Sequence, residues 1–158
     1  MLELINLTKV FKTGAFSSGR FKAVNNVSFK IERGEVTSLI GESGSGKSTI
    51  GKMILRLLTI TSGEIKLDER NISTIKGAEL RQYYKKVQGV FQDPFSSYNP
   101  IFKVDRVFEN LHDVFFKELR QSEWIDKVDS ALKKVGLDSE QVLGKYPHQL
   151  SGGQLQRI

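Results

Sequence analysis

The sequence has no cysteine, and this absence excludes disulfide bonds, zinc–thiolate sites and thiol chemistry. Proline is also scarce, with 3 among 158 residues, which argues against collagen-like and low-complexity classes. No apolar run approaches the roughly 20 residues that a membrane-spanning helix needs. The first ten residues alternate like a strand and do not resemble a signal peptide, so a cytosolic location is the default expectation.

What the chain does have is an ordinary globular composition with an excess of positive charge. It carries 24 lysine and arginine residues against 18 acidic residues, a formal net charge of +6. Such a charge suits nucleic acid, anionic lipid or nucleotide phosphate as a partner, but lysines scattered over a solvated surface give the same number. The length fits one domain or part of one.

The hydrophobic pattern divides the chain into a first part rich in strands and a second part rich in helices. Residues 36–40 (VTSLI) lie between two glycines and are expected to form a strand buried on both faces of an α/β sheet. Strands are expected at residues 2–11, 24–31, 36–40, 64–67 and 87–92, the first two as a hairpin around a mobile loop at 12–22. Helices are expected at residues 50–58, 78–86, 104–119 and 124–135, the last one starting around Ser122 and capped by Gly136.

A glycine-rich motif joins the strand expected at 36–40 to the helix that follows it. Residues 41–48 (GESGSGKS) match the GxxxxGK[ST] pattern of nucleoside triphosphate loops. A strand before the motif and a helix after it turn several backbone N–H groups toward an anion at the helix N-terminus. A glycine-rich turn that only caps the helix is the alternative. The context favours nucleotide binding.

Each residue type in this loop suits a triphosphate. Gly44 and Gly46 let the backbone approach phosphate, and Lys47 supplies a charge for the β and γ oxygens. The Ser48 hydroxyl would ligate Mg²⁺, whereas Glu42 is expected to face solvent rather than to act as a base. The residues of the loop expected to bind nucleotide are Gly41, Ser43, Gly44, Ser45, Gly46, Lys47, Ser48 and Thr49.

A second motif, LSGGQ, occupies residues 150–154. Gly152 and Gly153 expose backbone N–H groups, Ser151 offers a hydroxyl, and a helix beginning near Gln154 would direct its positive end at a γ-phosphate. A loop that merely caps that helix is the alternative. The phosphate loop, the segment around Gln92 and LSGGQ, in this order and at these separations, resemble the ATP-binding subunits of ABC transporters.

This resemblance covers essentially the whole chain and implies an α/β fold. It implies a P-loop (RecA-like) ABC ATPase core with an antiparallel β subdomain and an α-helical subdomain, without the core strands that follow in the family. The core with its β subdomain is expected at residues 1–93, the helical subdomain at 94–150, and the signature motif with the start of the next helix at 151–158. The resemblance also implies a head-to-tail dimer, in which Ser151, Gly152, Gly153 and Gln154 close over ATP held by the phosphate loop of a homologous subunit.

Two further residues take roles from the resemblance. Gln92 is expected to join the nucleotide core to the helical subdomain, to ligate Mg²⁺ or orient a water, and to serve with Lys47 as a catalytic residue. An ordinary polar residue at a strand end is the alternative. Phe11 occupies the position of an aromatic ring that stacks on adenine, although it could equally be a core residue, with Phe16 and Phe21 as other candidates for stacking.

A narrower resemblance concerns the importers of oligopeptides, dipeptides and nickel. It rests on residues 91–100 (FQDPFSSYNP), residues 146–154 (YPHQLSGGQ) and the long first loop. It implies an ATPase subunit, peripheral on the cytoplasmic face of the cell membrane, that couples ATP binding and hydrolysis to peptide uptake. The implied partners are a homologous subunit, two transmembrane permease subunits and an extracytoplasmic substrate-binding protein. Four apolar residues of the helical part would either form part of the groove that binds a permease helix or fill the core of the helical part itself. They are Phe95, Tyr98, Ile101 and Phe102.

The sequence also departs from the family. It stops at Ile158, before the aspartate, glutamate and histidine that the family places after the signature, so this fragment alone is expected to hydrolyse ATP poorly and to be poorly stable. His112 and His148 are expected to be structural or solvated. Two alternative functions remain: an ABC-type ATPase of DNA repair or chromosome maintenance, or a nucleotide-binding fragment without activity. No nucleic acid is expected, because zinc modules and sustained heptads are absent from the sequence.

Overall fold

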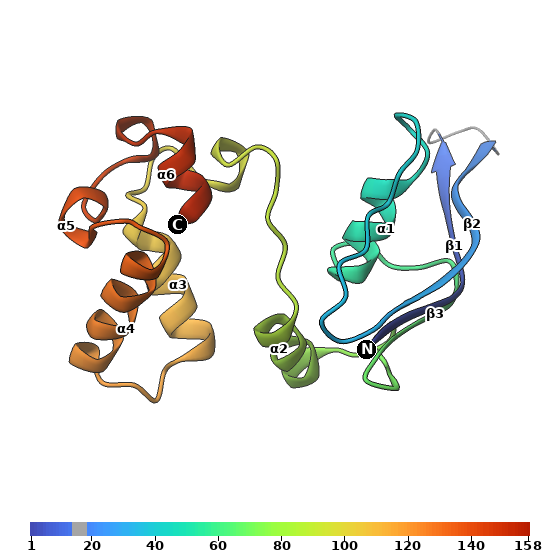
Figure 1. Cartoon of the computed structure of the whole chain (residues 1–158), viewed down its shortest axis with the longest axis horizontal. Coiled ribbons are helices and arrows are strands. Elements are labelled where there is room, and N and C mark those ends of the chain that lie inside the picture. Colours follow the sequence, from blue (N-terminus) through green and yellow to red (C-terminus); the bar gives the residue numbers. More distant parts are fainter. Residues whose placement is uncertain (14–18) are drawn as a thin grey trace. The chain divides into compact units, whose positions relative to one another are not determined.

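The computed structural model describes residues 1–13 and 19–158. It divides into two compact units, Met1–Gln88 and Gly89–Ile158. The first unit holds the strands and two helices, and the second unit is helical (Figure 1).

An antiparallel sheet forms the scaffold of the first unit. Its strands are β1 (Leu2–Thr13), β2 (Gly19–Ile31), β3 (Ser62–Leu67) and β4 (Arg70–Asn71), in the order β2-β1-β3-β4. The predicted hairpin of the first two strands is confirmed, and both strands extend further into the expected loop than the sequence pattern indicated. Strand β1 is central, since Leu4 pairs with Phe29 on one side and with Ile65 on the other.

A bulge in β1 sets which of its side chains face the core. Asn6 has a positive φ of 48°, and the register with β2 shifts between Leu4 and Leu7. Strict alternation would place Leu4 and Leu7 on opposite faces, yet both are fully buried. The bulge therefore adds Leu7 to the core that the sheet shares with the helices.

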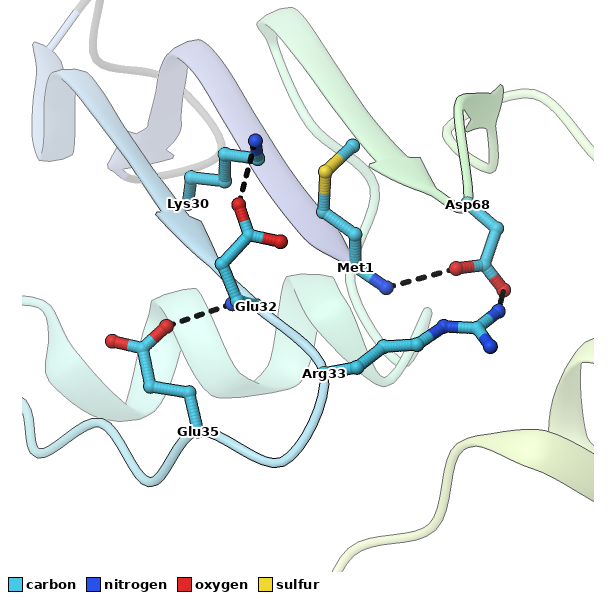
Figure 2. Close-up of polar contacts among 6 residues, drawn as sticks. All are labelled: Met1, Lys30, Glu32, Arg33, Glu35 and Asp68. Carbon is cyan, nitrogen blue, oxygen red and sulfur yellow. Dashed lines mark hydrogen bonds and ion pairs between the residues drawn. The ribbon is translucent and has the colours of Figure 1, made fainter.

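The polar end of the sheet is closed by the turn between β3 and β4. Asp68 and Glu69 form this two-residue turn, both with positive φ. One Asp68 carboxylate oxygen lies 2.8 Å from the Met1 ammonium and the other lies 3.2 Å from the Arg33 guanidinium (Figure 2). The hydrogen bond that the carboxylate accepts from the ammonium has the largest effect on the pKa of Asp68, followed by the one that it accepts from the guanidinium. Both lower this pKa. The start of β1, the end of β2 and the β3–β4 turn are thereby joined.

Helices α1 (Lys47–Ile54) and α2 (Gly77–Lys86) complete this unit. Helix α1 starts and ends earlier than the expected residues 50–58, and Leu57, which follows it, is exposed. The Tyr83 hydroxyl of α2 donates a hydrogen bond to the Ile54 carbonyl at the end of α1, and burial raises the pKa of Tyr83 to about 12. The buried side chains of the shared core are Leu4, Leu7, Val24, Ile50, Met53, Ile65, Ile72, Ile75 and Tyr83.

Two strand predictions are wrong. Residues 36–40 form no strand, and Val36 and Ile40 are 94% and 95% exposed rather than buried on both faces. Residues 87–92 also form no strand, and Val90 is exposed. Within the described residues neither segment has a neighbouring strand to bond, and an apolar run without hydrogen-bond partners cannot become part of a sheet.

The second unit packs helices around its own core. It contains α3 (Asp105–Phe115), α4 (Gln121–Lys134), α5 (Ser139–Val142) and α6 (Gly152–Arg157), with short 3₁₀ turns η1 (Phe95–Ser97) and η2 (Pro147–Gln149). The Glu123 carboxylate accepts the backbone N–H of Arg120, so α4 begins one residue before the expected Ser122. The buried core consists of Val104, Trp124, Val128, Leu132, Leu137, Val142, Leu150 and Leu155.

The expected helix at 104–119 is shorter in the structure and ends at Phe115. Among the residues that the structure describes, no helix has both the length and the apolar character needed to cross a membrane.

Candidate nucleotide-binding site

The predicted phosphate loop leads into α1 through glycines in a left-handed conformation. Gly46 immediately precedes the helix with φ of +94°, and Gly44 has φ of +84°. A Cβ built on Gly46 would lie 2.4 Å from the Ala23 carbonyl oxygen, whereas one built on Gly44 would meet nothing within 4 Å. Gly46 is therefore needed for two reasons, its backbone conformation and its close approach to strand β2.

The Lys47 side chain folds back over the loop that precedes it. Its ammonium donates hydrogen bonds of 2.7 Å to the carbonyl oxygens of both Gly41 and Glu42, and one of 3.2 Å to the Ser45 hydroxyl. All three acceptors lie within six residues of Lys47 in the sequence. The loop thus gathers a positive charge at the N-terminus of α1 through local contacts.

Several backbone donors of this loop have no protein acceptor. The first intrahelical bond runs from the Ile50 N–H to the Gly46 carbonyl at 2.9 Å, and the Ser45 N–H bonds the Glu42 carbonyl at 3.2 Å. Within residues 1–13 and 19–158, no hydrogen-bond partner is found for the amides of Gly44, Gly46, Lys47, Ser48 and Thr49. Unpaired N–H groups at the N-terminus of an eight-residue helix attract an anion.

A pocket of about 430 Å³ joins this loop to the β1–β2 hairpin. Phe11 and Phe21 are paired across the hairpin, and both line the pocket. The structure thus brings Phe11 to the phosphate loop, and it places Phe21, the alternative aromatic, beside it. Phe16, the other alternative, lies outside the described residues. The lining consists of Phe11, Phe21, Ala23, Ser43, Gly44, Ser45, Gly46, Lys47, Ser48 and Thr49.

Gln92 and the LSGGQ motif belong to the second unit. Gln92 is exposed and does not end a strand. The helix expected to begin near Gln154 begins at Gly152, within the LSGGQ motif. Two hydrogen bonds cap this start: the Ser151 hydroxyl accepts the Gln154 N–H at 3.2 Å, and the Gln154 side chain accepts the Ser151 N–H at 2.9 Å.

A hydrogen bond that the sequence did not reveal connects these two motifs. The Gln156 side-chain amide donates to the Phe91 carbonyl at 2.7 Å, so α6 holds the residue that precedes Gln92. The Tyr98 hydroxyl also bonds α6, at the Leu155 carbonyl, 3.0 Å away. The segment around Gln92 and the signature helix therefore form one structural group within this unit.

The remaining candidate groups lie apart from any cluster of ligands. The His112 ring lies 5.4 Å from the Trp124 ring with its Nε2 3.3 Å from the Leu119 carbonyl, and the His148 ring stacks on Tyr146. Glu42 is exposed. No group of three or more histidine, cysteine or acidic side chains in the described part of the chain could hold a metal ion.

One charged residue near the pocket, Lys9, is not among the residues that the sequence motifs predict for the site. Lys9 is 9% exposed, and its ammonium lies over the Phe11 ring, 5.1 Å from the ring centre. Leu7, Lys9 and Phe11 occupy every second position of β1, so a lysine stands where the alternation of apolar residues predicts an apolar one. That break was the available signal.

Comparison with known proteins identifies the family. The ABC transporter family pattern matches residues 24–158, which include the phosphate loop, Gln92 and LSGGQ. The chain belongs to the ABC transporter family. The fold agrees: a dimeric ATP-binding cassette, MJ0796, in a post-hydrolysis state bound to ADP and Pi, superposes with a TM-score of 0.81 at 32% identity, over 99% of this chain and 66% of that one.

Curated relatives in this family are named for peptide transport. The oligopeptide transport ATP-binding protein OppF of Streptococcus mutans is 42% identical over the whole chain, which covers 50% of the relative. The dipeptide transport ATP-binding protein DppF of Lactococcus lactis is 41% identical with the same coverage. This ABC transporter family chain therefore spans about half the length of the curated relatives that it matches.

Proposed function

We propose that the chain carries the ATP-binding site of the ATPase subunit of an ABC importer, and that this importer takes up peptides. The observation that carries this proposal is the pocket in which unpaired loop amides, the Lys47 ammonium and two aromatic rings lie together. The names of the relatives support transport of peptides rather than DNA repair.

The phosphate part of the pocket suits a triphosphate in charge and in hydrogen bonding. The free amides from Gly46 to Thr49 are donors only, and the dipole of α1 adds to their positive potential. Lys47 contributes a cation whose present acceptors are two carbonyls and a hydroxyl. A phosphate oxygen is a stronger acceptor for an ammonium than these neutral groups are. Binding of ATP would therefore draw Lys47 from the loop carbonyls onto the phosphates.

The aromatic part of the pocket suits the base. Phe11 is half-buried and Phe21 exposed, and the two residues are paired across the hairpin of β1 and β2. A flat apolar ring stacks on a purine without requiring a particular hydrogen-bond pattern. We assign the base contact to Phe11, with Phe21 as the second ring of the same wall.

The residues also fit Mg²⁺ beside the phosphates. The Ser48 hydroxyl is exposed in the wall of the pocket and is a hard oxygen ligand of the kind that Mg²⁺ prefers. By its likeness to the family, Gln92 would supply a second oxygen. When bound, Mg²⁺ would neutralise phosphate charge and support hydrolysis by the whole protein.

The remaining roles concern the assembled transporter. We propose that Ser151, Gly152, Gly153 and Gln154 contact the ATP of a homologous subunit in a head-to-tail dimer. Phe95, Ile101 and Phe102 are exposed on the second unit, which suits a permease contact, whereas Tyr98 is half-buried. The assembly would lie on the cytoplasmic face of the membrane with two permeases and an extracytoplasmic binding protein. The domain limits at 93 and 150 remain predictions.

The direct test is ATP binding by the intact protein after removal of single charges from α1. Lys47→Ala should weaken ATP binding about 10-fold to 100-fold, since it removes a charge-assisted hydrogen bond to phosphate. Lys52→Ala is the matched control, because Lys52 is an exposed lysine of the same helix that does not line the pocket. Equilibrium titration with a fluorescent ATP analogue measures both. Equal affinities for Lys47→Ala and wild type would refute the assignment.

A further inference from the structure

Lys9 is a buried charge without a countercharge. It is the one charged residue of the described chain that is buried, at 9% exposure. No carboxylate among residues 1–13 and 19–158 lies within ion-pair distance of its ammonium. Burial of an ammonium is costly unless other groups stabilise it. The groups that stabilise it are Thr59, which accepts hydrogen bonds of 2.6 Å at its carbonyl and 3.4 Å at its hydroxyl, and the Phe11 ring.

The first contact of Lys9 fixes the chain that leaves α1. The ammonium donates a hydrogen bond of 2.6 Å to the Thr59 carbonyl. Between α1 and Thr59 the chain folds back on the helix, since the amides of Leu57 and Leu58 both bond the Lys52 carbonyl. Thr59 is thus held close to the end of α1, and the phosphate loop lies at the other end of that helix.

The second contact of Lys9 is the Phe11 ring. The ammonium lies 5.1 Å from the ring centre and over one of its faces, a favourable cation–π arrangement. Phe11 lines the pocket that also contains the phosphate loop. A single side chain therefore touches both the ring assigned to the base and the segment that follows the phosphate-binding helix.

We propose that Lys9 is a positioning residue of the nucleotide pocket. It holds one face of the Phe11 ring, which leaves the other face for the base, and its bond to Thr59 fixes where the ammonium, and with it the ring, lies relative to the connection after α1. Because a triphosphate without a base does not use Phe11, Lys9 affects binding of ATP and not binding of the phosphates alone. This inference rests on the proposed function, in which Phe11 stacks on adenine.

A purely structural role for Lys9 makes a different prediction. The connection after α1 has two other bonds to β1: the Thr61 N–H donates to the Thr8 carbonyl, and the Val10 N–H donates to the Thr61 hydroxyl, both at 2.9 Å. These bonds hold the connection when Lys9 is replaced. If Lys9 served the fold alone, its loss would weaken ATP and bare triphosphate binding together.

The test compares ATP with inorganic tripolyphosphate as ligands of the intact protein. In Lys9→Met, affinity for ATP should fall about tenfold, in the range that loss of a well-placed aromatic contact costs, while affinity for tripolyphosphate stays within about twofold. Lys9→Arg should restore ATP binding, because a guanidinium also stacks on an aromatic ring and donates to a carbonyl. If Lys9→Met does not fold, Lys9→Gln removes the charge and keeps a donor, with the same selective loss expected.

Two controls separate this role from its alternatives. Thr61→Val removes the acceptor of the Val10 N–H in the same connection without touching Phe11, so it should lower the melting temperature and leave the ratio of the two affinities unchanged. In a Phe11→Leu background, Lys9→Met should cause no further loss of ATP affinity.

The possible results are distinct. Equal losses for ATP and tripolyphosphate in the Lys9 variants, no loss for either ligand, or additive losses with Phe11→Leu would overturn the role of Lys9. A wild-type protein that bound neither ligand would instead overturn the proposed function. Selective loss of ATP binding, reversed by arginine, would establish the positioning role.

Discussion

Two apolar segments of the first unit, β1 and residues 36–40, have opposite structures. Strand β1 is paired with β2 on one side and β3 on the other, and its Leu4 is 1% exposed. Residues 36–40 are as rich in strand-forming residues, yet they are unpaired, and Ile40 is 95% exposed. The difference teaches that strand propensity becomes structure only where neighbouring strands supply hydrogen bonds and a face to pack against.

The phosphate loop follows the unpaired segment directly and nevertheless has a defined structure. Its hydrogen bonds join residues close in sequence, from Lys47 to Gly41, Glu42 and Ser45. Its Gly46 also closely approaches a distant segment, at Ala23 of strand β2. Formation of the loop therefore does not require pairing of residues 36–40.

The largest expected effect is on the free energy of unfolding. In the 158-residue chain, Leu4→Ala should destabilise the first unit by about 3 kcal/mol, because it leaves a cavity in the core. Ile40→Ala removes an exposed side chain and should change stability by less than about 0.5 kcal/mol. Urea unfolding followed by circular dichroism measures both. Similar losses for the two variants would show that residues 36–40 are packed as β1 is.

The second prediction contrasts the two left-handed glycines of the loop. Gly46→Ala places a methyl group against the Ala23 carbonyl and should reduce ATP affinity of the intact protein more than about tenfold. Gly44→Ala meets open space and bears only the conformational strain, about 1 kcal/mol, so its effect on affinity should be several times smaller. The opposite order of affinities would contradict the packing of the loop against β2.

The third prediction concerns pH and the contact between α2 and the end of α1. Tyr83 has an ordinary pKa of 10.0 when unfolded and a pKa of about 12 in the folded protein. The unfolded chain therefore loses this proton first, so stability is complete below pH 10 and declines as the pH rises toward 12. Tyr83→Phe should show a flatter decline in melting temperature over this range. Parallel declines for the two proteins would exclude Tyr83 as the cause.

Much of the site could be predicted from sequence because its signals are local. The GESGSGKS motif fixes the residues around Lys47, and the amphipathic pattern after it predicts α1. The failures at 36–40 and 87–92 arise because a strand depends on partners that local pattern cannot supply.

Two contacts across longer separations also could not be predicted. The Lys9 bond to Thr59 spans 50 residues and the Gln156 bond to Phe91 spans 65. No local spacing rule encodes either pair. The motif assigns Gly46 to the loop, but the approach of Gly46 to Ala23 depends on the position of the hairpin.

The smallest effect is expected at the polar rim of the paired sheet. The Met1 ammonium, and then Arg33, lower the pKa of Asp68, so its contribution to stability is present above its ordinary value of 3.8 and is lost as the pH falls below it. Asp68→Asn should slightly lower the melting temperature at pH 7, and the difference should vanish at pH 2 or in high salt. A difference that persisted under both conditions would point to the turn backbone instead.

The most direct test of the nucleotide site follows the backbone amides of the phosphate loop by NMR during titration of the intact protein with ATP. The amides from Gly46 to Thr49, unpaired in the protein alone, should move downfield as they bond phosphate oxygens, with the Phe11 ring signals shifting in the same titration. Unchanged loop amides at saturating ATP, or shifts confined to residues outside this pocket, would contradict the assignment of the site.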